Sequence, residues 1–263
     1  MIAVVGVGSM GAALVEGLLA ADHPPEAMIL VDRNQDKLDA FAGRGVMVGS
    51  DVAAVGAADW VIVAVKPYAM SATLGSLAAH LKPSATLISV AAGIDTAAIE
   101  AEFDRIAVVR AMPNTPALIG EAMTGVSPGL HVTPEQLQGA CEILGAVGEV
   151  AVVPEDQLDA LTAISGSGPA YLFYVAEALA EGAVSQGLPP ELADRLVRQT
   201  LRGAALLFDA SESDAAELRR RVTSKGGTTQ AAVVVFDEAD LKATFGAAVA
   251  AATNRSRELR GQS

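Results

Sequence analysis

Short apolar runs alternate with helix-period segments from residue 1 to about residue 152. Strands that are buried on both faces read as continuous apolar runs, whereas amphipathic helices repeat an apolar position every three or four residues. The alternation therefore predicts an α/β domain with a doubly wound parallel sheet and helices on both faces. The predicted strands are Ile2–Val5, Met28–Val31, Val46–Val48, Trp60–Val65, Thr86–Val90, Ile106–Arg110 and Val150–Val153.

After about residue 155 only helical patterns remain. The expected helices cover 155–164, 168–186, 190–208, 213–222, 228–236 and 240–257. We therefore expect two domains, an α/β domain over 1–154 and an all-α domain over 155–263. The segment from Ala170 to Gln186 is apolar nearly all round, and a helix without a polar face must be buried. We expect a homodimer, or a higher homo-oligomer, whose C-terminal helices interlock.

A glycine-rich turn joins the first predicted strand to the first predicted helix. In that context a G-x-G-x-x-G pattern is typical of a Rossmann domain, because its glycines allow a tight turn, admit a pyrophosphate and let helix pack on strand. The alternative, a glycine-rich turn without a ligand, is disfavoured by the strand-turn-helix context. The turn is predicted to bind NADPH or NADH through Gly6, Val7, Gly8, Ser9, Met10 and Gly11.

Residues at two strand ends are the next candidate cofactor contacts. Asp32 follows the second strand, where a carboxylate accepts from a ribose 2′-hydroxyl and repels a 2′-phosphate. Arg33 favours a phosphate, stacks on adenine, or is simply a solvated charge. The choice between NADH and NADPH therefore stays open. Beyond the strand Trp60–Val65, we favour a positioning role in which backbone atoms of Val65 and Lys66 touch the cofactor.

Hydroxyl and glycine residues gather a second time in the stretch from Arg221 to Thr229, just before a predicted helix. A helix start offers unpaired N–H groups and a partial positive charge, and glycines let an anion approach the backbone. The stretch therefore predicts a small-anion pocket. Two such pockets in one chain suggest a cofactor and a carboxylate substrate.

The composition of the chain limits the classes of partner that we expect it to bind. The net charge of −13 disfavours nucleic acid. The single cysteine, Cys141, rules out an internal disulfide, fits a reducing cytoplasm and is better explained as a packed small hydrophobe than as a nucleophile. His23, His80 and His131 have no metal-ligand spacing, so no metal site is expected. No apolar run reaches the roughly 18 residues of a membrane span, and Met1 leads straight into the first strand without a signal peptide.

Two further polar segments can be explained by structural roles. Ser165-Gly166-Ser167-Gly168 superficially suggests a nucleophile, but we expect its hydroxyls to cap the helix over 168–186. Asn114 and Thr115 stand between two prolines, so this rigid loop either holds side chains and peptide groups in place or is only a stiff turn.

These motifs, in order and at the usual spacing, resemble those of the Δ1-pyrroline-5-carboxylate reductase family along essentially the whole chain. The resemblance implies a Rossmann domain, a helical dimerisation domain and NAD(P)H-dependent hydride transfer to the C=N carbon of Δ1-pyrroline-5-carboxylate. The product is L-proline, in the last step of proline biosynthesis. The resemblance rests on Gly6–Gly11, Ala64–Pro67, Val90–Gly93, Arg110–Ala117, Ser165–Tyr171 and Val222–Thr229.

The resemblance also assigns site residues. Thr229 is implied to hydrogen-bond the ring nitrogen, as the catalytic residue, and Ala92 to contact the cofactor together with Val65 and Lys66. Asp51 aligns with a family asparagine that reaches the cofactor, so that contact is open. Lys225 replaces the family's usual proline; it either faces solvent or attracts the substrate, by less than about 1 kcal/mol. The implied substrate-binding residues are Ser224, Gly226, Gly227, Thr228 and Thr229.

Two rival classes of function remain. A β-hydroxyacid dehydrogenase or a general imine reductase could share the architecture. The β-hydroxyacid dehydrogenases rely on a lysine of the helical domain within a different motif, which this sequence does not match, and Lys225 lies in another loop context. A dinucleotide-sensing regulator would need a surface for nucleic acid or for a partner, and the acidic balance argues against DNA.

Overall fold

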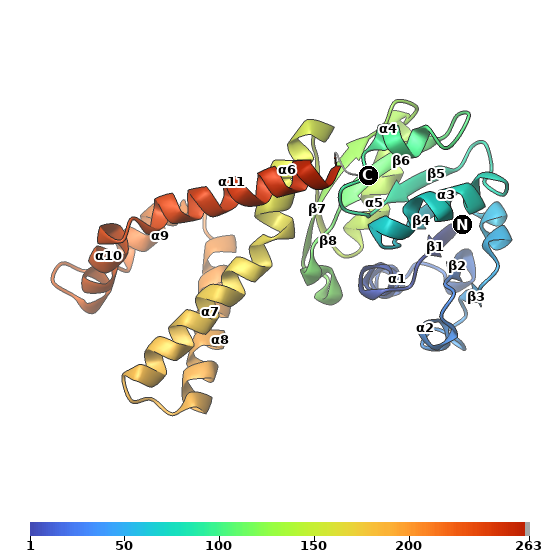
Figure 1. Cartoon of the computed structure of the whole chain (residues 1–263). Coiled ribbons are helices and arrows are strands. Elements are labelled where there is room, and N and C mark those ends of the chain that lie inside the picture. The colour runs from blue at the N-terminus through green and yellow to red at the C-terminus, as the bar shows by residue number, and fades with distance from the viewer. Residues whose placement is uncertain (261–263) are drawn as a thin grey trace. The chain divides into compact units, whose positions relative to one another are not determined.

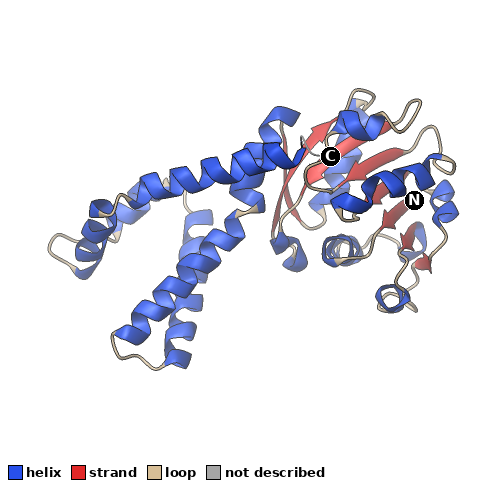
Figure 2. Ribbon diagram, viewed as in Figure 1, coloured by secondary structure: helices blue, strands red, loops and turns tan. Residues whose placement is uncertain are grey.

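The computed structural model describes residues 1–260 and divides into two compact units (Figure 1). The first unit holds Met1–Ser167 together with the end of the chain from Ala250 onward, and the second holds Gly168–Val249. The first is an α/β unit and the second consists of helices (Figure 2). The predicted fold class, a Rossmann-type domain followed by a helical domain, is confirmed.

The first unit is built on one eight-stranded sheet with the order β3-β2-β1-β4-β5-β6-β7-β8. All neighbouring strands are parallel except β6 and β7, which are antiparallel. The order reverses direction at β1, which pairs with β2 on one side and β4 on the other. The strands are β1 (Ile2–Val5), β2 (Met28–Val31), β3 (Met47–Gly49), β4 (Trp60–Val63), β5 (Thr86–Ser89), β6 (Ala107–Met112), β7 (Ala122–Pro128) and β8 (Gly148–Val152).

Helices cover both faces of this sheet because successive residues of each strand point to opposite sides. Val4 packs into the core under α1 (Ser9–Ala20) and α5 (Pro134–Gly145), and its neighbour Val5 packs into the core under α3 (Met70–Ala78). Burying one such Val or Leu side chain stabilises the fold by roughly 1.5–3 kcal/mol. The apolar runs seen in the sequence are therefore strands buried on both faces.

Strand β7 is absent from the sequence prediction. It carries Thr124 and Ser127 among apolar residues and ends in Pro128, so it lacks the apolar run that marks the other strands. The structure nevertheless buries both hydroxyl residues, with exposed fractions of 0% and 2%. Pairing with β6 and β8 satisfies the backbone hydrogen-bonding groups of β7 whatever its side chains are. Such a strand leaves no apolar run in the sequence by which it could be predicted.

The remaining elements of the first unit are short. Helix α6 runs into a π-helical turn, and the Ser165 hydroxyl donates to the carbonyl of Leu161 at 3.1 Å. The prediction that Ser165 caps the next helix is therefore wrong, because the chain is already helical there. The short elements are η1 (Pro25–Ala27), α2 (Gln35–Asp39), η2 (Val52–Ala57), η3 (Pro67–Ala69), α4 (Thr96–Glu100), η4 (Thr115–Ile119), η5 (Glu155–Gln157), α6 (Leu158–Leu161) and the π-helical η6 (Thr162–Gly166).

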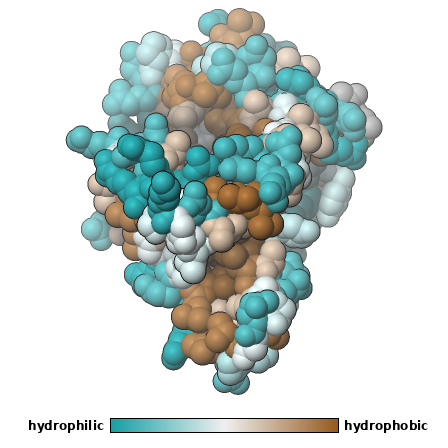
Figure 3. All heavy atoms as spheres, turned by 90° about the vertical axis from the view of Figure 1, so that its left-hand side faces the viewer, coloured by the Kyte–Doolittle hydropathy of each residue, from teal (hydrophilic) through white to brown (hydrophobic). Residues whose placement is uncertain are grey.

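The second unit contains helices only, as the patterns predict. Its first helix leaves its large apolar side chains exposed: Phe173 is 69% and Tyr174 is 74% accessible. Figure 3 shows hydrophobic side chains, in brown, gathered at the molecular surface. An apolar helix left open in one chain is what burial by a second copy requires. The helices after η6 are α7 (Gly168–Ser185), α8 (Pro190–Asp209), α9 (Ala215–Arg221), α10 (Thr228–Glu238) and α11 (Leu241–Arg260), whose last turns belong to the first unit.

Candidate functional site

The glycine turn between β1 and α1 has the geometry that an anion needs. Gly6 has φ +95, a conformation that suits glycine, and its N–H donates to the Val31 carbonyl at 2.8 Å. A Cβ on Gly11 would collide with the Gly6 carbonyl oxygen, so only glycine lets α1 start this close to the turn. Gly8 caps α1 without any side-chain hydrogen bond, and a Cβ there would find no atom within 4 Å. The first amides of α1 therefore face open space in which a pyrophosphate fits.

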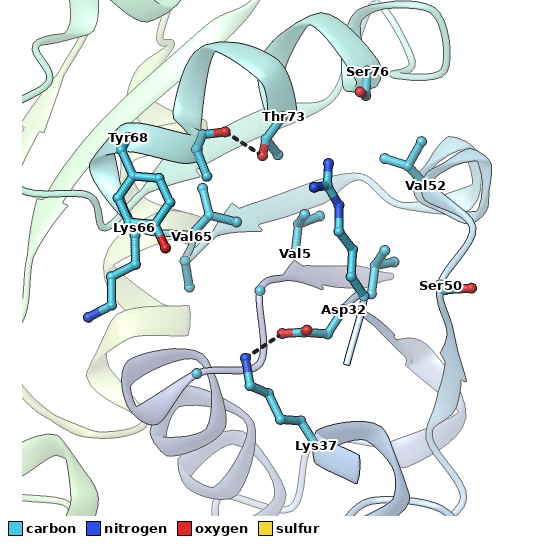
Figure 4. Close-up of a pocket in the computed structure, with 16 residues that line it drawn as sticks. Val5, Asp32, Lys37, Ser50, Val52, Val65, Lys66, Tyr68, Thr73 and Ser76 are labelled. Carbon is cyan, nitrogen blue, oxygen red and sulfur yellow. Dashed lines mark hydrogen bonds and ion pairs between the residues drawn. The ribbon is translucent and has the colours of Figure 1, made fainter. Parts of the chain in front are cut away.

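Asp32 ties this turn to the end of β2. Its Oδ2 accepts from Lys37 Nζ at 3.2 Å (Figure 4). The same oxygen accepts from the Val7 amide at 2.7 Å, and Oδ1 accepts from the Asn34 amide at 2.9 Å. Burial is the largest single influence on the pKa of Asp32 and raises it. The Asn34 and Val7 amides and Lys37 together outweigh burial, so the pKa is lowered from its ordinary value of 3.8. The carboxylate is thus charged at neutral pH and holds the turn.

A cavity of about 470 Å³ lies above the glycine turn at the carboxyl ends of β1, β2 and β4 (Figure 4). This is where open α/β sheets bind their ligands. Arg33 lines the cavity and makes no hydrogen bond or ion pair with any residue in 1–260. The lining residues are Val5, Gly6, Gly8, Val31, Asp32, Arg33, Lys37, Ser50, Val52, Ala64, Val65, Lys66, Tyr68, Ala69, Thr73 and Ser76.

The structure gathers most of the predicted cofactor residues around this one cavity. Val7, Ser9, Met10 and Gly11 form the turn and the first residues of α1 but do not line it. Ala92 lines a neighbouring cavity, which shares Tyr68 with the first. The predicted residues that do line the first cavity are Gly6, Gly8, Asp32, Arg33, Val65 and Lys66. Their contacts with a cofactor stay predictions.

Several lining residues escaped the sequence analysis. Lys37 lies on α2, shortly after Asp32 in the sequence, and a cation so close to the strand-end carboxylate is a signal that the sequence offers. Ser50 follows β3, Thr73 and Ser76 lie on α3, and the three hydroxyl residues form no sequence motif. Asp51, whose contact with the cofactor was open, caps η2 by accepting from the Ala53 amide at 2.9 Å. Only its neighbours line the cavity.

The second predicted anion site lies in the helical unit, at the start of α10. Gly227 is the N-cap, and no side chain hydrogen-bonds the first amides of the helix in the part of the chain that the structure describes. The preceding loop is ordered by its own contacts: the Gly226 amide donates to Gln230 Oε1 at 2.5 Å and the Gly227 amide to the Ser224 carbonyl at 3.1 Å. Lys225 is exposed. The helix start is thus open to a small anion.

The loop at Asn114 works as a clamp. The buried Asn114 amide donates to the Ser165 carbonyl at 2.9 Å, and its oxygen accepts from the Met123 amide at 3.0 Å. Of the two readings of this proline-bounded loop, the structure supports the one in which it holds peptide groups in place.

Residues 1–260 contain no cluster of three or more His, Cys, Asp or Glu side chains placed to hold a metal ion. Among the helices that the structure describes, none is long and apolar enough to cross a membrane.

In this chain the glycine turn, the uncapped helix start and the cavity lie together at the carboxyl edge of a doubly wound sheet. This combination is that of the nicotinamide-dinucleotide-dependent oxidoreductases with a Rossmann domain. Two family models refine the class. Residues 1–93 match the model described as NADP oxidoreductase, coenzyme F420-dependent, and residues 155–259 match the one described as pyrroline-5-carboxylate reductase dimerisation.

Individual relatives agree with these models. The pyrroline-5-carboxylate reductase of Pseudomonas aeruginosa is 41% identical, over 99% of this chain and 97% of the relative. A solved pyrroline-5-carboxylate reductase from Coxiella burnetii superposes with a TM-score of 0.93 at 38% identity, over 98% of this chain and 97% of that one. The Plasmodium falciparum pyrroline carboxylate reductase, solved with NADP bound, gives 0.87 at 27% identity, over 98% and 97%.

The chain belongs to the pyrroline-5-carboxylate reductase family. The family, the oxidoreductase class and the use of NAD(P)H that the sequence predicts are thereby confirmed. The matched dimerisation domain supports assembly into a homo-oligomer.

Proposed function

We propose that the protein reduces Δ1-pyrroline-5-carboxylate to L-proline, with its Rossmann unit holding the cofactor and the start of α10 holding the substrate carboxylate. The observation that carries this assignment is the pair of uncapped helix starts behind glycine turns, one in each unit. Relatives named pyrroline-5-carboxylate reductase match nearly the whole chain and support the substrate.

The Rossmann unit binds and orients the cofactor. The open amides at the start of α1 receive the pyrophosphate, and the Asp32 carboxylate fixes the turn that presents them. Val65 and Lys66 follow β4, at the nicotinamide half of the carboxyl edge. The bound cofactor supplies one hydride to the C=N carbon.

The α10 start binds the substrate. The peptide amides of Thr228 and Thr229, the first two residues of α10, hold the carboxylate, and Ser224 adds a hydroxyl donor. The Thr229 hydroxyl hydrogen-bonds the ring nitrogen, which already carries a proton in the electrophilic form of the imine. Carbon gains the hydride and nitrogen keeps its proton, so the product is the neutral ring amine. Because reacting atoms must approach to about 3–3.5 Å, the assembled enzyme must bring both ligands together.

We further propose that the protein uses NADPH in preference to NADH. The Asp32 oxygens are already engaged by two amides and by Lys37, so the carboxylate has little capacity left for a ribose hydroxyl. Arg33 is unpaired within residues 1–260 and lines the same cavity, where a guanidinium suits a 2′-phosphate.

We also propose how the two parts of the chain divide these roles in the assembled protein. Residues 1–154 bind the cofactor, and the helical part after residue 154 provides dimerisation and substrate binding, although its residues 155–167 and 250–260 belong to the compact unit of the sheet. The C-terminal helices of two copies cover one another. The protein works in the cytoplasm, without nucleic acid as a partner.

The test follows NADPH absorbance with three substrate sets: Δ1-pyrroline-5-carboxylate, a 3-hydroxyacid with oxidised cofactor, and buffer. Turnover with the cyclic imine alone is expected; turnover with the 3-hydroxyacid instead would overturn the assignment. Thr229→Val should lower kcat/KM for the imine about ten- to hundredfold, or roughly 1.4–2.8 kcal/mol. Thr244→Val, on the exposed side of α11, is the matched control and should keep wild-type kinetics.

A further inference from the structure

The last turns of α11 are fastened to the first unit by a buried carboxylate. Asp159 on α6 is 1% exposed. Its Oδ1 accepts from the Ser256 hydroxyl at 2.7 Å, and its Oδ2 lies 3.2 Å from the Arg260 guanidinium. A buried charge is stable only when it is paired and hydrogen-bonded. The cofactor and substrate contacts described above do not use Asp159.

The last turn of α11, which Asp159 holds, places Leu259 in contact with the loop that follows β5. A Cβ built on the buried residue Gly93 would lie 3.4 Å from Leu259 Cβ and 3.5 Å from its backbone carbonyl. These distances are those of ordinary van der Waals contact, so the end of α11 packs directly on the loop, and the positive φ of Gly93 (+78) is what favours glycine there. Leu259 also lines the cavity of about 560 Å³ that Ala92 and Tyr68 line. The end of α11 is thus one wall of the space beside Ala92.

The C-terminal end of the same loop, at Thr96, is also held by hydrogen bonds. Glu155 accepts from the Thr96 amide at 2.9 Å and from the Thr96 hydroxyl at 2.6 Å, and it pairs with Arg110 at 3.2 Å. Arg110 is 2% exposed. The loop from Ala92 to Asp95 therefore runs between two anchors, one at Thr96 and one at Leu259.

We propose that Asp159 and Leu259 are positioning residues for cofactor binding: Asp159 fixes the end of α11, and Leu259 then supports the Ala92–Gly93 loop beside the nicotinamide. The inference rests on the proposed function only for the place of the nicotinamide next to Ala92. Neither residue touches the reacting atoms. Their effect is to keep a glycine-containing loop from adopting conformations that would not fit the cofactor.

The test measures the Kd for NADPH by its fluorescence, without substrate, beside the KM for the imine and the thermal midpoint. Leu259→Ala keeps the Cβ and the backbone that lie near Gly93 but removes the rest of the side chain from the wall of the cavity beside Ala92, and it should raise the Kd about fivefold. The imine KM should change less than about twofold. Leu259→Met, which conserves volume, should restore the wild-type Kd. Asp159→Asn keeps an acceptor for Ser256 but loses the charge pair, and should raise the Kd about two- to threefold.

The matched control is Arg255→Gln, which breaks an exposed ion pair with Glu258 on the same helix and should leave the Kd unchanged. Amide hydrogen exchange at Ala92 and Gly93 should quicken in Leu259→Ala and not in the control. Unchanged NADPH affinity and unchanged exchange in both Leu259→Ala and Asp159→Asn would overturn the proposal, even if their thermal midpoints fell. If Leu259→Ala fails to fold, Asp159→Asn decides by the same criterion. Failure to turn over the imine would instead count against the proposed function, since the Kd comparison contains no substrate.

Discussion

The two units of this chain bury their apolar residues in opposite ways. In the first, helices on both faces of the sheet enclose two cores, and side chains such as Leu14 and Leu87 are fully inaccessible. In the second, Ala193 alone is buried among residues 168–249, all of which the structure describes. The first unit therefore carries its own stability, whereas the helices of the second need a further surface, which we propose that a second copy supplies. Composition does not show this contrast; only the burial of particular residues does.

The strongest test of the contrast is to make α7 unable to accept a partner. Phe173→Asp places a charge on a side chain that is 69% exposed in one chain and that we place inside the dimer. Burying an unpaired carboxylate there is prohibitive, so the variant should be monomeric by sedimentation. Its imine reductase activity should fall at least about a hundredfold, since obligate dimers often lack a stable folded monomer.

The control for that change is Leu130→Asp. Leu130 is 82% exposed and lies in the first unit, in the loop between β7 and α5. This variant should stay dimeric and active. A monomeric Phe173→Asp protein with wild-type turnover would remove the basis of the comparison.

A second test separates folding from ligand binding within the first unit. Gly11→Ala puts a Cβ against the Gly6 carbonyl and should lower both the thermal midpoint and NADPH affinity, the latter more than about tenfold. Gly8→Ala finds no atom within 4 Å, so its thermal midpoint should stay near wild type while NADPH affinity falls, because the methyl group occupies the space of the pyrophosphate. Gly75→Ala, in open space on α3, is the control and should change neither affinity nor fold. Equal thermal losses for Gly8→Ala and Gly11→Ala would contradict this division of roles.

The sequence predicts some parts of the fold and of the site better than others, and burial explains the difference. Strands buried on both faces leave apolar runs, so β1 and β2 are predicted with their observed bounds. Strand β7 is held by pairing on both sides with Thr124 and Ser127 in its interior, and no local pattern reports that. The glycine turn is a contiguous motif and is predictable. Ser50, after β3, reaches the same cavity as Thr73 and Ser76 of α3, and only the folded chain brings these two segments together. Likewise, nothing near Asp159 in the sequence points to Ser256.

A smaller effect tests the cofactor end of the first unit. Arg33→Gln removes the unpaired guanidinium from the cavity and should lower the ratio of kcat/KM with NADPH to kcat/KM with NADH about tenfold, the scale of one charge-assisted hydrogen bond. Turnover with NADH should change little, because no 2′-phosphate is present. Arg105→Gln, exposed after α4, serves as the control for lost positive charge. A proportional loss with both cofactors would mean that Arg33 does not read the phosphate.

The smallest expected effect is the pH dependence of Asp32. Because its pKa in the folded chain is lowered from 3.8, the charged carboxylate stabilises the fold at pH values above about 4. That contribution is lost as the pH falls through the still lower folded pKa. Asp32→Asn should therefore lower the thermal midpoint by a constant amount from pH 7 to about 5, and the difference from wild type should shrink below pH 4. Asp104→Asn, an exposed carboxylate, is the control.

All the partners of Asp32, namely Val7, Asn34 and Lys37, lie in the first unit. If that unit is self-sufficient, the acid-dependent difference between Asp32→Asn and its parent must persist when both also carry Phe173→Asp and no dimer forms. If the difference disappeared in the monomeric pair, the glycine turn would depend on assembly. The contrast between a self-contained cofactor unit and a partner-dependent helical unit would then be wrong.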